Sequence, residues 1–290
     1  MKMFDVSTID ALAKLLAVGP FEIDEVNSQR SQYYWARRVP KSNGGSRLLQ
    51  VPEGKLKFLQ QKVKSHILDL IQPLDCVHGG VLGRSVMSNA RPHIGKEIVF
   101  SLDVEDFFPS VGPCTVMSIF EALGFRLYAA DLLTSITTWN DQLPQGAPTS
   151  TGLANLSMTR VDVRVGKLAR CHDFTYTRFV DDLTISGTSR LLDFRKLLVR
   201  IVEEEGFRIN PQKQRTMHSG ERQIVTGLVV NTKLNLPREK RTIIRRNVAQ
   251  FSRLRSQRAS ALNSIRGQIS WVSSVNCALG RRLLNRVRLG

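Results

Sequence analysis

The first apolar residues of the chain recur at intervals of three and four, as on one face of a helix: Ile9, Leu12, Leu15 and Leu16. Ser7 or Thr8 precedes them and can cap such a helix. From Tyr33 to Pro52, aromatic, branched and basic residues surround Gly44 and Gly45, a dipeptide typical of turns. We therefore expect a short packing helix followed by a basic β-hairpin.

Two longer stretches also have helical spacing. Lys55 to Ile71 alternates apolar and basic residues, and Arg238 to Gly290 has a similar pattern. In the second stretch, four apolar residues carry the spacing: Ile244, Val248, Phe251 and Leu254. His78 to Gly95 is rich in glycine and polar residues, which indicates a loop. We expect a helix after the hairpin, then a loop, and a basic helical region at the C-terminal end.

The central part of the chain contains two strand-like runs. Glu97–Asp103 (EIVFSLD) and Asp173–Val180 (DFTYTRFV) bracket about 70 residues of helical character, including Val116–Leu123 and Leu153–Leu168. A further helix and strand pattern follows from Leu191 to Val230. This order predicts an α/β layer with a helical insertion between two carboxylate-bearing strands.

Charge indicates the kind of partner. The 290 residues include 42 Lys and Arg against 25 Asp and Glu, a formal net charge of +17. Such a balance favours a polyanion, with nucleic acid as the first candidate and an anionic membrane surface as the second. No apolar run approaches the roughly 20 residues that span a bilayer, and Asp5, Asp10 and Lys14 interrupt the first segment. We therefore expect a protein that does not act on membranes.

The four cysteines are widely scattered, with no CxxC pair: Cys76, Cys114, Cys171 and Cys277. This spacing fits neither a structural zinc site nor a disulfide framework. We interpret them as reduced packing residues of a cytoplasmic protein.

Three carboxylates stand at the ends of the strand-like runs. Asp103 ends the first run, and Asp181 and Asp182 lie at the tip of a hairpin pattern 78 residues later. If the strands are neighbours, the acids meet at one sheet edge and their repulsion requires cations. Carboxylate oxygens suit Mg²⁺, and two such ions can activate a hydroxyl and stabilise a leaving pyrophosphate. Each motif alone is also ordinary turn or cap chemistry.

Three motifs in this order resemble the signature of reverse transcriptases: LDVEDFFPS at 102–110, LPQGAPTS at 143–150 and FVDD at 179–182. The resemblance implies an α+β right-hand polymerase with an α/β palm. Its parts would be an N-terminal helical segment (1–30), fingers and palm (31–235, palm core about 97–235 with a helical insertion) and a basic helical thumb (236–290).

The resemblance also implies catalytic roles. Asp103 and Asp181 would be the main ligands of two Mg²⁺ ions, with Asp182 supporting the metal and the primer end. Phe108 would be the gate against a ribose 2′-hydroxyl, with Phe107 as its neighbour, and we expect one of the pair only to pack in the core.

Further residues would hold the nucleotide. Gln145 and Gly146 resemble a loop beside the incoming nucleotide, where glycine permits close backbone approach. Lys41 and Arg47 resemble finger residues that grip the triphosphate. Lys213 resembles a lysine near the pyrophosphate, although a solvated lysine at a helix end is the alternative.

Two elements narrow the resemblance to retron reverse transcriptases, namely NAxxH from Asn89 to His93 and VTG from Val225 to Gly227. The alternatives are a helix cap at Asn89 and a buried strand at VTGLVVN. The predicted nucleic-acid-binding residues come from these elements and the basic tail: Asn89, His93, Val225, Thr226, Gly227, Arg253, Arg255 and Arg258. For His93, we expect a structural or RNA-contact role and not a general base.

Three positions in two places depart from the family pattern. FVDD stands where YADD is common, and Thr151 stands where proline is frequent. Neither departure removes a carboxylate. After Asn231 the only acid is Glu239, so degradation of the template would require a host ribonuclease H.

The retron resemblance implies synthesis of branched multicopy single-stranded DNA (msDNA) from a cognate structured non-coding RNA and deoxynucleoside triphosphates. It also implies that the RNA–DNA product stays bound and acts with a separate effector protein in antiphage defence in the cytoplasm. The alternatives are another bacterial reverse transcriptase, of group II intron, diversity-generating or abortive-infection type, or a non-catalytic nucleic-acid-binding scaffold.

Overall fold

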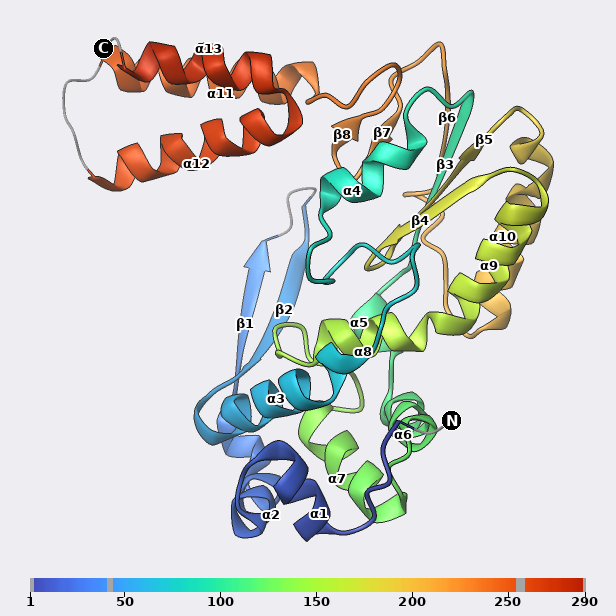
Figure 1. Cartoon of the computed structure of the whole chain (residues 1–290), viewed down its shortest axis with the longest axis vertical. Coiled ribbons are helices and arrows are strands. Elements are labelled where there is room, and N and C mark those ends of the chain that lie inside the picture. The colour runs from blue at the N-terminus through green and yellow to red at the C-terminus, as the bar shows by residue number, and fades with distance from the viewer. Residues whose placement is uncertain (1–2, 41–43, 254–258, 289–290) are drawn as a thin grey trace.

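The structure is a computed structural model that describes residues 3–40, 44–253 and 259–288 (Figure 1). The predicted first helix is α1 (Ile9–Leu16), and its cap is Thr8, whose side chain accepts a hydrogen bond from the Ala11 N–H. Its apolar face is buried against α2 (Pro20–Ser28), which starts with a proline at its first turn. A 3₁₀ turn, η1 (Arg30–Tyr33), leads into the hairpin.

The predicted basic hairpin is confirmed. Strands β1 (Tyr34–Pro40) and β2 (Ser46–Pro52) pair antiparallel along their whole length. Gly45 takes the left-handed conformation that the turn requires (φ 81°). The helix expected next is α3 (Gly54–His66), and it ends earlier than predicted because a separate 3₁₀ turn, η2 (Leu68–Leu70), follows it.

The segment predicted as a loop contains helical turns, so this prediction is wrong in part. α4 (Val86–Ala90) and η3 (Arg91–His93) lie within it. α4 starts at a capping box in which the Ser85 and Ser88 side chains each bond the other's backbone N–H. Five residues are too few to show a periodic apolar pattern, so the sequence contains little signal for this helix.

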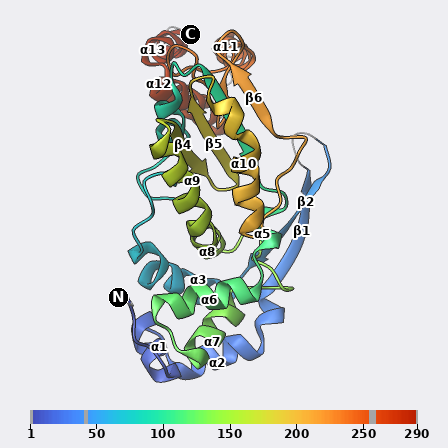
Figure 2. The ribbon, with the colours of Figure 1, turned by 90° about the vertical axis from the view of Figure 1, so that its right-hand side faces the viewer.

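A four-stranded antiparallel sheet forms the centre, in the order β4-β5-β3-β6. Its strands are β3 (Ile98–Asp103), β4 (Thr175–Phe179), β5 (Asp182–Gly187) and β6 (Arg215–His218). Helices α9 (Thr159–Cys171) and α10 (Leu191–Glu204) cover one face of the sheet (Figure 2). Of the two predicted strands, β3 therefore does not pair with β4: β5, the second strand of the hairpin that carries Asp181 and Asp182, lies between them.

The insertion between β3 and β4 is helical, as expected. It comprises α5 (Phe107–Ser110), α6 (Pro113–Leu123), α7 (Leu127–Thr137), α8 (Ser150–Ser157) and the already described α9. The helical character predicted from Leu153 to Leu168 is confirmed, in the form of two helices that meet at Met158. The Ser157 and Thr159 hydroxyls both donate to backbone carbonyls at this junction, which competes with helix continuation.

The C-terminal region has a hydrophobic core of its own. A small hairpin, β7 (Ile224–Val225) and β8 (Leu228–Val229), precedes three helices. These helices are α11 (Arg238–Arg253), α12 (Ala259–Val275) and α13 (Cys277–Arg288). Ile244 and Val248 are buried in this core, whereas Leu254 lies outside the described residues.

Strand β3 separates the two cores. Its Phe100 lies in the large core that α1 shares, and its Val99 lies in the core of the C-terminal helices. The exact bounds of the predicted subdomains stay a prediction.

Three of the cysteines are not packing residues. Cys76 is half-buried, but the other three are exposed, so the packing prediction is wrong for them: Cys114, Cys171 and Cys277. Within the described residues, no helix is both long enough and apolar enough to cross a bilayer.

Candidate active site

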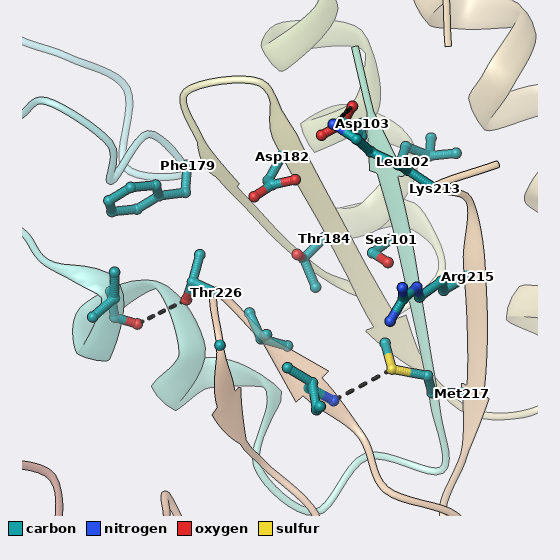
Figure 3. A pocket seen from close by; sticks show the side chains of 14 residues that line it. Ser101, Leu102, Asp103, Phe179, Asp182, Thr184, Lys213, Arg215, Met217 and Thr226 are labelled. Carbon is teal, nitrogen blue, oxygen red and sulfur yellow. Dashed lines mark hydrogen bonds and ion pairs between the residues drawn. The ribbon is translucent and has the colours of Figure 1, made fainter. Parts of the chain in front are cut away.

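The three predicted carboxylates meet at one edge of the sheet. Asp103 ends β3 and pairs directly with Asp182, which begins β5 (Figure 3). Asp181 precedes β5, and its carbonyl accepts a hydrogen bond from the Val104 N–H at 3.0 Å. This contact extends the pairing of the two strands past their ends, so the acids are held by backbone geometry.

Lys213 also belongs to this edge. Its Nζ donates to Asp103 Oδ1 at 2.6 Å. The Asn210 N–H donates to the Asp103 carbonyl at 2.8 Å, which brings the segment before β6 alongside β3. Burial acts to lower the pKa of Lys213, but the hydrogen bond and the charge of Asp103 outweigh it and raise that pKa above its ordinary value. Lys213 is thus solvent-exposed, as the alternative has it, but it is paired with Asp103 and lies in a turn and not at a helix end.

The pKa values of the acids show how much the site disfavours uncompensated negative charge. Burial raises the pKa of Asp181, and the charge of Asp103 acts in the same direction. The positive charges of Lys213 and Arg47 oppose this rise. Although Asp182 still reaches solvent, desolvation together with the charges of Asp181 and Asp103 raises its pKa to about 7. A further cation would relieve this repulsion.

The donor set fits a hard divalent cation that takes much of its coordination from water and phosphate. Carboxylate oxygens from β3 and β5 share one open edge, and an ammonium group already pairs with one of them. Within the described residues, no three His, Cys, Asp or Glu side chains form a metal cluster by themselves.

The two phenylalanines after Asp103 differ in environment. Phe107 is buried, with its ring centroid 5.8 Å from that of Phe207. Phe108 is half-buried at the start of α5. One aromatic ring of the pair therefore packs in the core, as expected, and the other reaches the surface.

The loop at Gln145 and Gly146 lies against the finger strand β2. The Gln50 N–H donates to the Gln145 carbonyl at 2.9 Å. Gly146 has φ 124°, and a Cβ there would lie 3.0 Å from Val51 Cγ2. Arg47 is exposed on the same strand, whereas Lys41 lies outside the described residues.

Asn89 and His93 of the NAxxH element lie in the interior, which corrects the expectation of direct RNA contact and agrees with the structural alternative for His93. Asn89 and His93 are fully buried. The His93 ring bonds the Ser186 hydroxyl at 2.7 Å and the Thr177 hydroxyl at 2.8 Å, and burial lowers its pKa to about 3. The neutral ring thus ties η3 to strands β4 and β5. Asn89 points to the VTG element, with 3.5 Å from its Nδ2 to the hydroxyl oxygen of Thr226.

The VTG element lines a cavity of about 400 Å³ beside the carboxylates (Figure 3). Its lining includes Asp103, Asp182, Lys213, Arg215, Thr226 and Gly227. The Thr226 hydroxyl donates to the Val86 carbonyl at 3.1 Å, and Val225 is buried, so Val225 cannot contact RNA directly in this conformation.

The predicted arginine contacts of the basic tail are mostly beyond structural description. Arg255 and Arg258 lie outside the described residues, and for Arg253 only the backbone at the end of α11 is described.

Sequence reasoning missed the close approach of Gly79 to the hairpin of β4 and β5, the candidate catalytic hairpin, which carries Asp181 and Asp182. A Cβ on Gly79 would lie 2.4 Å from Val180 N and 2.9 Å from the Phe179 carbonyl carbon. The sequence signal for this close approach is the pair Gly79-Gly80, which lies in the segment predicted as a loop.

Comparison with known proteins agrees with this geometry. The fold resembles that of a telomerase from Candida albicans, solved with a TWJ fragment of telomeric RNA, with a TM-score of 0.53 and 11% identity over 87% of this chain and 56% of that one. Residues 39–254 match the family model of reverse transcriptases, described as RNA-dependent DNA polymerases. The chain therefore belongs to the reverse transcriptase family.

Curated relatives narrow the family. The chain is 36% identical to the retron Mx65 reverse transcriptase of Myxococcus xanthus, over 89% of this chain and 65% of the relative. It is also 36% identical to the retron Ec86 reverse transcriptase of Escherichia coli, over 83% of this chain and 75% of the relative. The chain is of the retron type and spans somewhat less than two thirds of the length of the first of these relatives.

Gly79→Ala should slow any DNA synthesis by the protein by about 100-fold, because the new Cβ must displace the backbone that carries Asp181. Single-nucleotide primer extension on an RNA template would measure the effect. Gly220→Ala is the matched control, since nothing lies within 4 Å of its Cβ position. A Gly79→Ala protein as fast as the wild type would show that the close packing is unimportant.

Proposed function

We propose that this protein synthesises DNA on an RNA template as a retron reverse transcriptase. The observation that carries the proposal is the pairing of Asp103 with Asp182, with Asp181 beside them, in a chain of this family. Similarity to retron reverse transcriptases over most of the chain supports the finer assignment.

Asp103, Asp181 and Asp182 would hold two Mg²⁺ ions. When bound, such ions activate a primer hydroxyl and neutralise charge on the leaving pyrophosphate. The backbone pairing of β3 with β5 orients the carboxylates before any substrate arrives. Lys213, held at Asp103, would supply positive charge or a proton on the pyrophosphate side.

The nucleotide would lie between the carboxylate edge and the fingers. Arg47 and Lys41 would bind its triphosphate, and the Gln145–Gly146 loop would lie along it. The half-buried Phe108 would exclude a ribose 2′-hydroxyl, supported by Phe107 in the core.

The product would be branched msDNA that starts at a guanosine 2′-hydroxyl of a cognate non-coding RNA. The partners would be that RNA, the RNA–DNA product, deoxynucleoside triphosphates, a host ribonuclease H and a separate effector protein in antiphage defence. The net charge of +17 supports a nucleic-acid partner. Because Asn89, His93 and Val225 are buried, Thr226, Gly227 and the basic tail are the better candidates for RNA contact.

Two experiments test the function. A homopolymer RNA template with a DNA primer and Mg²⁺ should yield DNA, whereas a chain that binds the template without extending the primer would be a scaffold. Sequencing of nucleic acid that copurifies with the protein should identify a branched RNA–DNA species. Active protein that carries only linear or random nucleic acid would contradict the retron assignment.

Asp181→Asn should abolish primer extension and leave RNA affinity nearly unchanged, because a neutral amide keeps the shape of the side chain but is a poor Mg²⁺ ligand. Extension and filter binding on the same preparations would separate the two effects. Substantial synthesis by the variant in Mg²⁺ would contradict the metal assignment.

Phe108→Ala should admit ribonucleotides, since it removes the ring that would collide with the 2′-hydroxyl. The ratio of kcat/KM for ribo- and deoxynucleotides measures the change. Phe107→Ala is the comparison, and it should mainly lower the melting temperature because Phe107 is buried. If Phe107→Ala relaxes sugar selection and Phe108→Ala does not, the assignment is shifted by one residue.

Replacing the exposed Arg245 and Arg246 of α11 with glutamine should reduce the slope of log affinity against log salt by about 2, since each lost phosphate contact changes it by roughly one. Affinity should fall equally for all RNAs. Lys196→Gln, exposed on α10, is the control. An unchanged slope would exclude α11 from the phosphate-binding surface.

A further inference from the structure

A fully buried ion pair lies behind the catalytic hairpin and plays no part in the proposed chemistry. Arg178, on β4, is 0% exposed, and Asp162, on α9, is 2% exposed. Arg178 Nε donates to Asp162 Oδ1 at 2.8 Å, and Nη2 donates to Oδ2 at 2.6 Å. The Tyr176 hydroxyl donates to the same carboxylate at 2.6 Å. The pair is bidentate and closed to solvent.

The guanidinium also donates hydrogen bonds to the catalytic hairpin and to α8. Arg178 Nη1 donates to the Val180 carbonyl at 2.8 Å and to Asn155 Oδ1 at 2.9 Å. Nη2 also donates to the Asn155 carbonyl at 3.3 Å. Asn155 in turn donates from Nδ2 to the Gly79 carbonyl at 2.8 Å. One side chain therefore connects α8, α9 and the Gly79 loop to the residue before Asp181.

Val180 needs such support because its backbone is strained. Its φ is 60°, in the left-handed region that branched residues rarely adopt. A conformation of this kind persists only where its surroundings enforce it. Gly79 leaves no room for a side chain beside Val180 N, and Arg178 binds the Val180 carbonyl. The backbone of Val180, held at both its N and its carbonyl, sets the position of Asp181, the next residue.

Stability alone does not explain the ion pair. Apolar residues of similar volume often replace a buried ion pair without loss of stability, since desolvation offsets the attraction between the charges. Apolar residues could not hold a carbonyl oxygen. The geometry therefore requires the guanidinium at Val180 and not merely in the core.

We propose that Arg178 is a positioning residue, which with Asp162 and Asn155 fixes the Val180 carbonyl so that Asp181 and Asp182 stay opposite Asp103. This proposal rests on the proposed function, because it assumes that the acids held in place by Arg178 are the ones that carry out catalysis. Arg178 itself touches no reacting atom, because it is fully buried.

Arg178→Lys keeps a positive charge for Asp162 but loses the fork of donors that reaches Asp162 and Val180 together. It should lower kcat of primer extension by about 100-fold, raise the Mg²⁺ concentration needed for half-maximal rate and leave KM for the nucleotide unchanged. Arg164→Gln is the matched control, since it removes a partly exposed ion pair from the same helix α9. It should change neither kcat nor the Mg²⁺ requirement.

The triple variant R178M/D162L/Y176F separates positioning from stability. It removes both charges and the hydroxyl that would lose its acceptor, but it leaves the Val180 carbonyl and Asn155 without their donor, so it should fold with a moderately lower melting temperature and remain slow. Recovery of the wild-type kcat in this variant would overturn the proposal. If the triple variant does not fold, Arg178→Lys decides, measured well below its own melting temperature, and a wild-type kcat there would equally overturn it.

Hydrogen exchange tests the proposal without catalysis. The Val104 N–H donates to the Asp181 carbonyl, so its protection reports whether the hairpin stays against β3. Arg178→Lys should lose this protection, and Arg164→Gln should keep it. Unchanged protection in Arg178→Lys would overturn the positioning role even if the wild type proved inactive, whereas wild-type inactivity with lost protection would contradict only the proposed function.

Discussion

The site depends on the backbone pairing of β3 with β5. Residue Asp103 stands opposite Asp182 only in this register, and a shift by one residue would turn the side chains of one strand to the other face of the sheet. Apolar side chains on β3 reach into two separate cores, through Phe100 and Val99, so any shift would expose apolar surface on both sides. The same burial that stabilises the sheet therefore aligns the acids.

This alignment has an electrostatic cost that the surroundings only partly offset. Burial and the charge of Asp103 raise the pKa of Asp181, and burial together with the charges of Asp181 and Asp103 raises the pKa of Asp182 to about 7. Lys213 compensates directly at Asp103, and Arg47 opposes the effect from the finger hairpin. Because a residual repulsion remains, the edge is suited to bind divalent cations together with the phosphates that they accompany. The net charge of +17 favours a polyanionic partner.

Local patterns predicted the regular elements well, because spacing of three and four residues in α1 and a Gly-Gly turn in the hairpin are determined by neighbours in the chain. The order of the acidic motifs also predicted that Asp103 and Asp182 would meet. Burial of polar residues was not predictable in this way. His93 and Arg178 are charged or polar side chains, which are usually exposed, and their partners come from distant segments. Only the tertiary structure reveals that both support the sheet from inside.

Iron-directed cleavage would test most directly whether the register of β3 and β5 creates a divalent-metal site. Fe²⁺ bound in place of Mg²⁺, with ascorbate and peroxide, cuts the backbone close to the ion, and mass spectrometry locates the cuts. The account predicts cleavage beside Asp103 and also beside Asp181 and Asp182, with both cuts suppressed by excess Mg²⁺. Cleavage at only one of the two segments, or cuts that Mg²⁺ does not suppress, would contradict a shared site.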